Sequence, residues 1–290
     1  MDFKYRMRRL AKEPLGLQQW PRKAAVRPRN FEQQIYSALV REGDICFDVG
    51  ANVGDVALYL ARLAGRTGCV VAFEPVFSTY CELSQHLQID CYEKAPIVTI
   101  PMGLSDKVGP AMISIPVQNF YRSSLAAPEQ WQQAQFATSI STYQCDFTTL
   151  DVALEGKKFS VPDFIKIDVE GAELLVLHGG GANFESGFRP LMVVELFAPW
   201  EEAFGYGPWT ALSYLMSFGY QFLFMCPLGL VEHHPSPAAP VPSEYEQGDM
   251  IVAFVPENHA DRIERLRGLR HNGGGSVLTV PALPFPNRVA

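Results

Sequence analysis

The fold is decided by the stretch Ile45-Cys46-Phe47-Asp48-Val49-Gly50-Ala51-Asn52-Val53-Gly54-Asp55. Its apolar first half has the composition of a buried β-strand, and a helical pattern begins directly after its second glycine. Between the two, Gly50 and Gly54 allow the sharp backbone turn that a strand-to-helix connection needs. A strand, a glycine-rich turn and a helix in this order predict a ligand site where the strand meets the helix.

An acid in this turn narrows the class of ligand. Dinucleotide sites use a G-x-G-x-x-G turn, and the pyrophosphate lies at the N-terminus of the helix. Here Asp48 precedes Gly50, so a phosphate would be repelled and an ammonium or sulfonium group attracted. The pattern Asp48-x-Gly50-x-Asn52-x-Gly54 therefore favours S-adenosylmethionine, a cationic adenosine cofactor without phosphate, over a nicotinamide dinucleotide.

Outside this stretch, apolar runs alternate with helical patterns over most of the chain. Seven sheet strands are predicted, at 44–49, 69–73, 97–101, 163–168, 191–196, 220–226 and 249–255. Short links between strands and helices predict an α/β fold with a mostly parallel, Rossmann-like sheet and helices on both faces. Strand patterns at 111–116 and 139–147 interrupt the alternation and predict a small β insertion before the fourth sheet strand.

The segments around this sheet predict one domain with additions. Residues 1–29 form a basic, irregular N-terminal arm, and residues 30–256 form the main domain, with an insertion at about 107–150. A Pro-rich loop is expected at 227–248, and residues 257–290 are expected to form a C-terminal helix and tail.

Charge and cysteine usage exclude some classes of function. The first 30 residues carry nine Lys and Arg and two acids, so the rest of the chain, with fifteen basic and twenty-nine acidic residues, has a net charge of −14. An acidic body argues against nucleic acid as the substrate, whereas the basic arm allows a weak contact with an acidic surface. No apolar run is long enough for a membrane span, and six scattered cysteines fit reduced thiols in a cytoplasmic protein.

Polar residues at three further strand ends complete the predicted cofactor site. Glu74 ends the second strand, where a carboxylate accepts hydrogen bonds from ribose hydroxyls. Ser105 and Asp106 follow the third strand, where the adenine is expected. Asp168 ends the fourth strand and is expected to bind the methionine end of the cofactor or the substrate.

Four residues are candidates for a general base. Glu170 follows Asp168, although an acid at this helix start also stabilises the helix dipole. Glu195 lies in an apolar strand, where a carboxylate is costly unless it is paired, so a structural ion pair is the alternative role. His233 and His234 lie in the Pro-rich loop. Three acids at these strand ends would suit magnesium, but their spacing is not specific, and no metal is predicted.

Six motifs in a fixed order resemble the FkbM family of S-adenosylmethionine-dependent methyltransferases. They are Asp48-Val-Gly-Ala-Asn-Val-Gly, Ala72-Phe-Glu-Pro75, Leu104-Ser-Asp106, Thr148-Thr-Leu-Asp151, Ile165-Lys-Ile-Asp-Val-Glu-Gly-Ala-Glu173 and Val193-Val-Glu195. The resemblance implies a class I methyltransferase sheet of seven strands, the last antiparallel. It also implies methyl transfer to a hydroxyl oxygen of a sugar, a polyketide or another small molecule.

The alternative is a module that binds S-adenosylmethionine without catalysis, as a regulator or scaffold. A base beside the methyl group distinguishes an enzyme from such a module. No Asn/Asp-Pro-Pro-aromatic motif follows the fourth strand, which disfavours transfer to nitrogen. The small-molecule or glycan acceptor is expected to be selected by residues 1–30, 117–137 and 198–290.

Overall fold

The computed structural model describes residues 30–88, 94–116, 140–155, 161–207, 210–226, 229–232 and 249–269. The predicted basic arm, most of the predicted Pro-rich loop and the tail after residue 269 lie outside these residues. None of the described helices has the length and apolar character that crossing a bilayer requires.

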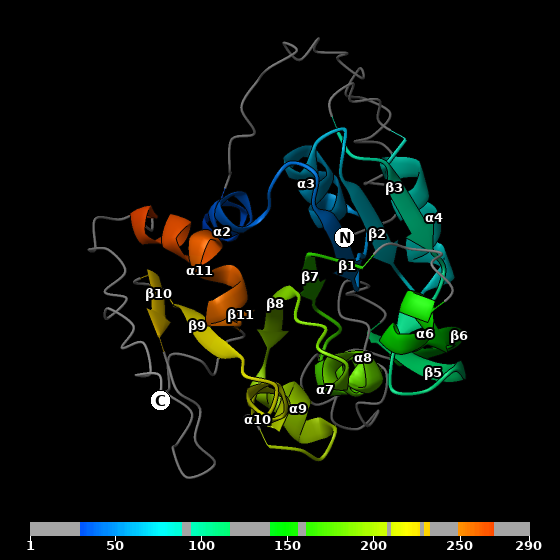
Figure 1. Cartoon of the computed structure of the whole chain (residues 1–290). Coiled ribbons are helices and arrows are strands. Elements are labelled where there is room, and N and C mark those ends of the chain that lie inside the picture. Colours follow the sequence, from blue (N-terminus) through cyan, green and yellow to red (C-terminus); the bar gives the residue numbers. More distant parts are fainter. Residues whose placement is uncertain are drawn as a thin grey trace.

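A sheet of eight strands forms the centre of the molecule, in the order β10-β9-β11-β8-β7-β1-β2-β3 (Figure 1). The strands are β1 (Ile45–Val49), β2 (Cys69–Phe73), β3 (Ile97–Ile100), β7 (Phe164–Ile167), β8 (Leu191–Leu196), β9 (Gln221–Cys226), β10 (Gly229–Glu232) and β11 (Asp249–Phe254). From β3 to β8 the neighbours are parallel, and β11 is antiparallel to both β8 and β9. The predicted seven-stranded, mostly parallel sheet with an antiparallel last strand is confirmed.

The edge strand β10 is an addition to the seven predicted strands. It forms within the segment expected to be a Pro-rich loop and pairs antiparallel with β9. Leu230 is 2% exposed and packs into the core, so burial of an apolar side chain stabilises this short strand.

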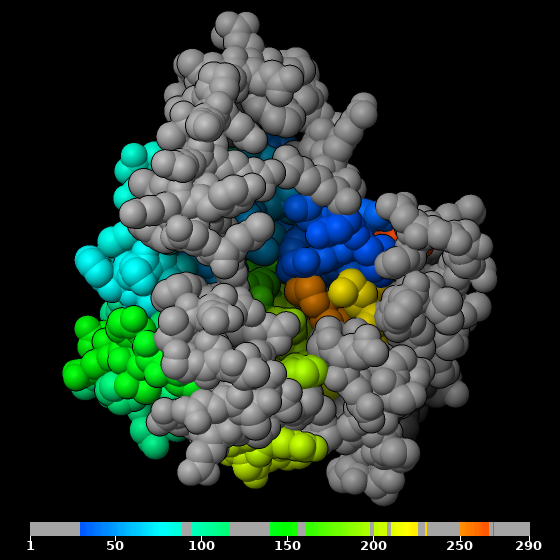
Figure 2. Space-filling view, turned by 180° about the vertical axis from the view of Figure 1, so that it is seen from behind, coloured from blue at the N-terminus to red at the C-terminus, as the bar shows by residue number. Residues whose placement is uncertain are grey.

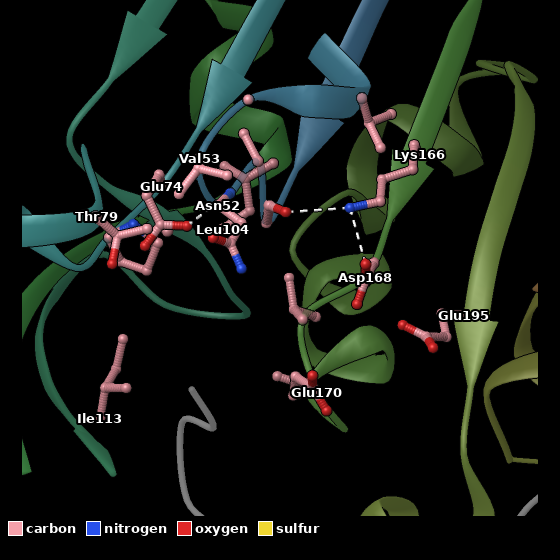
Figure 3. A pocket seen from close by; sticks show the side chains of 18 of the residues that line it. Asn52, Val53, Glu74, Thr79, Leu104, Ile113, Lys166, Asp168, Glu170 and Glu195 are labelled. Carbon is pink, nitrogen blue, oxygen red and sulfur yellow. Dashed lines mark hydrogen bonds and ion pairs between the residues drawn. The ribbon is translucent and has the colours of Figure 1, made fainter. Parts of the chain in front are cut away.

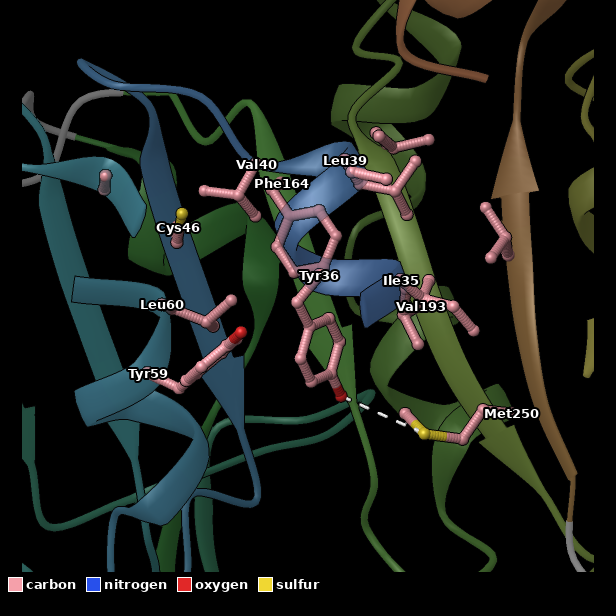
Figure 4. Packing of buried hydrophobic residues seen from close by; sticks show 14 of the residues in the cluster. Ile35, Tyr36, Leu39, Val40, Cys46, Tyr59, Leu60, Phe164, Val193 and Met250 are labelled. Atoms are coloured by element: carbon pink, nitrogen blue, oxygen red, sulfur yellow. Dashed lines mark hydrogen bonds between the residues drawn. The ribbon is translucent and has the colours of Figure 1, made fainter. Parts of the chain in front are cut away.

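Helices cover both faces of the sheet, as predicted. On one face α2 (Phe31–Leu39), α3 (Asp55–Ala64), α4 (Phe77–His86), α11 (Pro256–Glu264) and the 3₁₀ helix η3 (Arg265–Gly268) contribute to one core. On the other face α6 (Leu150–Leu154), α7 (Glu173–His178), α8 (Gly181–Glu185) and α10 (Thr210–Met216) contribute to a second core. Figure 4 shows the first core, where the Tyr36 ring meets Phe164 edge-on at a centroid distance of 5.9 Å.

A separate three-stranded sheet confirms the predicted β insertion. It consists of β4 (Gly103–Leu104), β6 (Ile140–Thr148) and β5 (Gly109–Pro116), in that order. Ile113, Ile115 and Phe147 of this sheet form a small core with Val76, which follows β2. The insertion is therefore fixed to the sheet edge near β2, and Figure 2 shows β6 and α6 in green on that side of the molecule.

The helix α11 packs against α2 and the start of β1. Arg262 pairs with the buried Asp44 and donates to the Leu39 carbonyl oxygen at 3.0 Å. Ile263 and Leu266 are buried in the first core. We propose that α11 and η3 belong to the main domain, because their contacts are those of core elements.

Candidate functional site

The turn after β1 is held by the two neighbouring strands. The amides of Gly50 and Ala51 donate to the Phe73 carbonyl oxygen at the end of β2, at 3.1 and 2.9 Å. Gly50 and Gly54 have φ angles of 78° and 91°, which favour glycine. Gly54 also faces α4, where an added Cβ would lie 2.5 Å from Leu83 Cδ1. The positive φ angles therefore favour glycine at both positions, in addition to any close approach of a ligand.

A cavity of about 280 Å³ lies at the carboxyl ends of the strands, beside this turn. Its wall combines the turn with the ends of β2, β7 and β8 and with the insertion. The predicted site residues that line it are Gly50, Asn52, Gly54, Glu74, Asp168, Glu170 and Glu195. Seven residues from four separate parts of the chain therefore meet at one site, at the sheet edge where α/β folds bind ligands.

The two ends of the cavity differ in chemistry (Figure 3). Thr79, Leu104 and Ile113 lie at one end, whereas Asp168, Glu170 and Glu195 lie at the other. Phe147 adds to the apolar end and packs so closely on Gly103 that a Cβ there would lie 2.3 Å from the ring. The cavity therefore has an apolar end formed partly by the insertion and an acidic end formed by β7 and β8.

Glu74 lies where β2 ends and holds the turn. Its Oε2 accepts from the Asn52 amide at 3.0 Å, and its Oε1 accepts from the Val76 amide at 2.9 Å. The side chain is 6% exposed, and this burial raises its pKa to about 7. Each carboxylate oxygen keeps a further lone pair, so Glu74 retains the capacity to accept hydrogen bonds from a ligand hydroxyl.

A buried lysine connects the two acids of the β1 and β7 strand ends. The Lys166 ammonium lies 3.0 Å from Asp168 Oδ2 and 3.5 Å from Asp48 Oδ1. It also donates to the Gly50 carbonyl oxygen at 3.1 Å. Burial alone would lower the pKa of Lys166, but the Asp168 and Asp48 carboxylates outweigh burial and raise it. Lys166 is therefore a cation inside the sheet.

Glu195 and Asp168 form a pair of unequal acids. Burial, the hydrogen bond to Asp168 and the charges of Asp168 and Glu170 raise the pKa of Glu195 to about 10. Burial opposes ionisation of Asp168 too, but the Lys166 charge and the hydrogen bond from Glu195 outweigh it and lower the pKa of Asp168. At neutral pH, Glu195 therefore carries the proton and Asp168 carries the charge.

Two residues that line the cavity have strained backbones. Asn52 has φ 50° and Glu170 has φ 53°, and among the described residues they are the only non-glycine residues with positive φ. A side chain in this region costs about 1–2 kcal/mol, and such strain is concentrated at functional sites. The strain therefore supports a functional role for both turns.

Three predicted cofactor residues do not line the cavity. Asp48 is fully buried beneath the turn, and its contact is Lys166. Ser105 is 5% exposed and donates to Asp106 at 3.2 Å, while Gly103 and Leu104 line the cavity at that strand end. Contacts of Asp48, Ser105 and Asp106 with the cofactor stay predictions. His233 and His234 lie outside the described residues.

Sequence reasoning did not name several residues of the cavity wall as site residues, and Lys166, Ile113 and Phe147 are among them. A signal for Lys166 was present, because a lysine interrupts the otherwise apolar strand Phe164-Ile165-Lys166-Ile167. For Ile113 and Phe147 the signal was weaker, because an apolar residue in an insertion strand is expected in its core in any case.

The lining fits the predicted cofactor. Its titratable residues are five acids and one lysine whose charge is already paired, namely Asp55, Glu74, Asp168, Glu170, Glu195 and Lys166. Such a wall suits a cation and ribose hydroxyls and opposes phosphate. Within the described residues no cluster of His, Cys, Asp and Glu forms a metal site.

Comparisons with known proteins give a family and several relatives. The model of the methyltransferase FkbM domain matches residues 48–225, more than half of the chain. Hexuronic acid methyltransferase AglP of Haloferax volcanii is 29% identical over 160 residues, covering 53% of this chain and 58% of that protein. The chain thus matches less than two thirds of that relative's length.

Several solved structures are similar to this chain, but their sequence identity to it is low. A methyltransferase FkbM from Methylobacillus flagellatus is 18% identical, with a TM-score of 0.42 and coverage of 76% of this chain and 47% of that one. An S-adenosylmethionine-dependent O-methyltransferase from Thermotoga maritima is 14% identical, with a TM-score of 0.41 and coverage of 81% and 67%.

The match to the FkbM domain begins at Asp48, near the end of β1 and just before the glycine turn, and ends in β9. It therefore includes the glycine turn, the Glu74 strand end, the insertion and the Asp168–Glu195 pair. The chain belongs to the FkbM family of methyltransferases and uses S-adenosylmethionine as its cofactor.

Proposed function

We propose that the protein transfers a methyl group to a hydroxyl oxygen of a sugar or a similar small molecule, at the acidic end of the cavity. The observation that carries this proposal is the group of carboxyls from β7 and β8, where Asp168, Glu170 and Glu195 line one end of a cavity. The relative that methylates a hexuronic acid supports a sugar-type acceptor.

The cofactor is proposed to lie along the cavity, with its adenine at the apolar end. Leu104, Ile113 and Phe147 would contact the adenine, and Glu74 would accept from the ribose hydroxyls. Asp168 would pair with the ammonium of the methionine end, because it is the acid that Lys166 keeps ionised. When bound, S-adenosylmethionine supplies an electrophilic methyl group on its sulfonium.

Glu195 is the proposed base, with Glu170 as the second candidate. A hydroxyl is a weak nucleophile at neutral pH, so a base that accepts its proton as the carbon–oxygen bond forms contributes about 10²–10⁴-fold. Glu195 holds a proton at rest because its pKa is raised to about 10. A cationic ligand beside it stabilises the carboxylate, so Glu195 can lose this proton on formation of the complex and then receive one from the acceptor.

An acceptor screen with methyl-labelled cofactor tests the proposal. The protein is incubated with glycan, lipid and small-molecule fractions, and then with matched neutral hexosides and hexuronates. Alkaline hydrolysis separates the products, since a methyl ether keeps the label and a methyl ester of a uronic acid loses it. We expect label that is stable to base and depends on Glu195 or Glu170. Base-labile label, or binding of the cofactor with no transfer in any fraction, contradicts hydroxyl methylation; the second result favours a non-catalytic binding module.

A further inference from the structure

Lys166 lines the cavity, but its ammonium group is surrounded by acceptors of the protein itself. An ammonium group has three donors, and the Lys166 ammonium faces three acceptors. They are the Gly50 carbonyl oxygen at 3.1 Å, Asp168 Oδ2 at 3.0 Å and Asp48 Oδ1 at 3.5 Å. Its side chain is 4% exposed. The contact with Asp48 is an ion pair without a hydrogen bond, and the burial of Lys166 favours an action on a ligand through these three groups.

Strand register explains why these groups meet. Asp48 of β1 and Lys166 of β7 are direct partners in the parallel pair, so their side chains lie on the same face. Asp168 follows two residues later and shares that face. Lys166 is also the partner of Val193 in β8, which places Glu195, two residues after Val193, beside position 168.

The turn after β1 depends on Lys166 at one side and on Glu74 at the other. Lys166 holds the carbonyl oxygen of Gly50, the first residue of the turn. Glu74 holds the amide of Asn52, two residues later. A change at Lys166 therefore affects both the turn and the acid at the end of β7.

We propose that Lys166 is a positioning residue that joins the two halves of the cofactor site: it fixes the Gly50 turn and orients the Asp168 carboxylate toward the cofactor's ammonium group. This inference rests on the proposed placement of the cofactor with its methionine end at Asp168. It differs from a purely structural role, which would make Lys166 important for stability alone.

Because of the titratable groups around Asp168, the inference predicts a specific dependence of cofactor binding on pH. Lys166 is the cation beside Asp168. The other titratable groups that act on this cluster are Asp48 of β1, Glu74 at the end of β2, Glu195 of β8, Glu170 of the following turn, Glu173 of α7, and Glu32 and Tyr36 of α2. Without Lys166, Asp168 would lie among carboxyls and its pKa would rise. Its ability to bind an ammonium group would then be lost at low pH and regained as the pH rises.

Calorimetric titration with S-adenosylhomocysteine, which keeps the ammonium group, tests this signature. The proteins are wild type, Lys166→Met, the double variant Asp48→Asn/Lys166→Met, and Asp168→Asn. The double variant removes one of the two carboxylates that Lys166→Met would leave unpaired, so it protects folding. Arg262→Met is the matched control, because it breaks the buried pair with Asp44 at the opposite end of β1. Folding is measured by circular dichroism and thermal unfolding.

At neutral pH we expect the double variant and Asp168→Asn to bind at least about tenfold more weakly than wild type. Over about pH 5–8, the ratio of double-variant to wild-type affinity should rise with pH, because Asp168 titrates only in the variant. Glu74 is present in both proteins, and the two charges that the double variant removes act on the pKa of Glu74 in opposite directions, so their removal has opposing effects on it. Arg262→Met should lose stability but bind like wild type.

A folded double variant that binds within about twofold of wild type at every pH would overturn the inference. A double variant that binds more weakly than wild type by the same factor at every pH would also overturn the inference, because loss of structure alone predicts that result. Failure of wild type itself to bind S-adenosylhomocysteine would instead overturn the proposed cofactor site, so the two claims fail by different results.

Discussion

Gly50 packs directly against the backbone of Asp168. A Cβ atom on Gly50 would lie 1.9 Å from the Asp168 carbonyl oxygen and 3.0 Å from its carbonyl carbon. The ends of β1 and β7 therefore approach each other only because position 50 has no side chain. Since Gly50 carries the turn and Asp168 the acidic end, this contact sets the geometry between the two halves of the cavity.

Gly50→Ala should abolish S-adenosylhomocysteine binding, because the added methyl group collides with backbone that cannot rotate away. Gly187→Ala is the matched control. Gly187 has a φ angle of 94° and nothing within 4 Å of an added Cβ, so it has the same type of backbone strain without the collision. Calorimetry and thermal unfolding compare the two. Equal affinity in both variants would show that the contact with Asp168 does not control the site.

Ile113→Ala should weaken S-adenosylhomocysteine binding by about four- to fifteenfold, the loss expected when roughly one to two buried methylene contacts are removed. Ile115→Ala is its control. Both residues are buried in the small core of the insertion, but of the two only Ile113 lines the cavity. Both variants should therefore lose similar stability, and only Ile113→Ala should lose affinity. A loss of affinity in Ile115→Ala of the same size would indicate that insertion stability, not adenine contact, is the cause.

Glu195→Gln should lower turnover by about 10²–10⁴-fold while changing S-adenosylhomocysteine affinity much less. An amide resembles the protonated Glu195, which is the resting state because the pKa is raised to about 10. In wild type, kcat/KM should rise with pH toward about 10, since a base acts when deprotonated, and this rise should be absent in Glu195→Gln. Glu170→Gln, measured beside it, identifies the alternative base. A variant that loses cofactor affinity more than turnover would give Glu195 a structural role.

Glu201→Gln should stabilise the protein at neutral and alkaline pH. Burial, and then the Glu173 carboxylate, raise the pKa of Glu201 from 4.5 to about 9, and Glu201 Oε1 has no hydrogen-bond partner among the described residues. A raised pKa means that the stability from the protonated group is complete below about 4.5 and is lost as the pH rises through about 9. Gln keeps a carbonyl oxygen at this position but cannot ionise, so Glu201→Gln removes the cost of burying a charge here.

Thermal unfolding across this pH range measures the effect. The melting temperature of wild type should fall relative to that of Glu201→Gln as the pH rises, by about 2–4 °C for each kcal/mol. The neighbouring Glu202 is exposed, so Glu202→Gln should follow wild type throughout. Identical curves for Glu201→Gln and wild type would show that Glu201 ionises without cost to the fold.

Much of the sheet was predictable because its strands are continuous apolar runs, which the sequence shows without knowledge of their partners. The predicted bounds of β2 and β8 coincide with those of the structure, and α3 begins directly after Gly54 as predicted. The β4 strand was not predictable, since it has two residues and exists only through its pairing with β6. The β10 strand was not predicted because it lies in a proline-rich segment, which indicates a loop, and because it forms by pairing with β9.

For the site, sequence reasoning found the residues at the strand ends but not the contacts between them. Periodicity places Asp48 and Asp168 at one edge of the sheet, but it does not show that Lys166 lies between them. Nor does it show that Glu195 shares a hydrogen bond with Asp168. These relations depend on which strands are neighbours and in which register, and non-local pairing of that kind is set by the whole fold.

A crystal structure with bound S-adenosylhomocysteine tests the central claim most directly. The account predicts that the adenine lies among Leu104, Ile113 and Phe147, that the ribose hydroxyls meet Glu74, and that the ammonium group meets Asp168. Glu195 should then face the open space beside the sulfur. Electron density for the ligand in the reverse orientation, or at a site away from this cavity, would contradict the account.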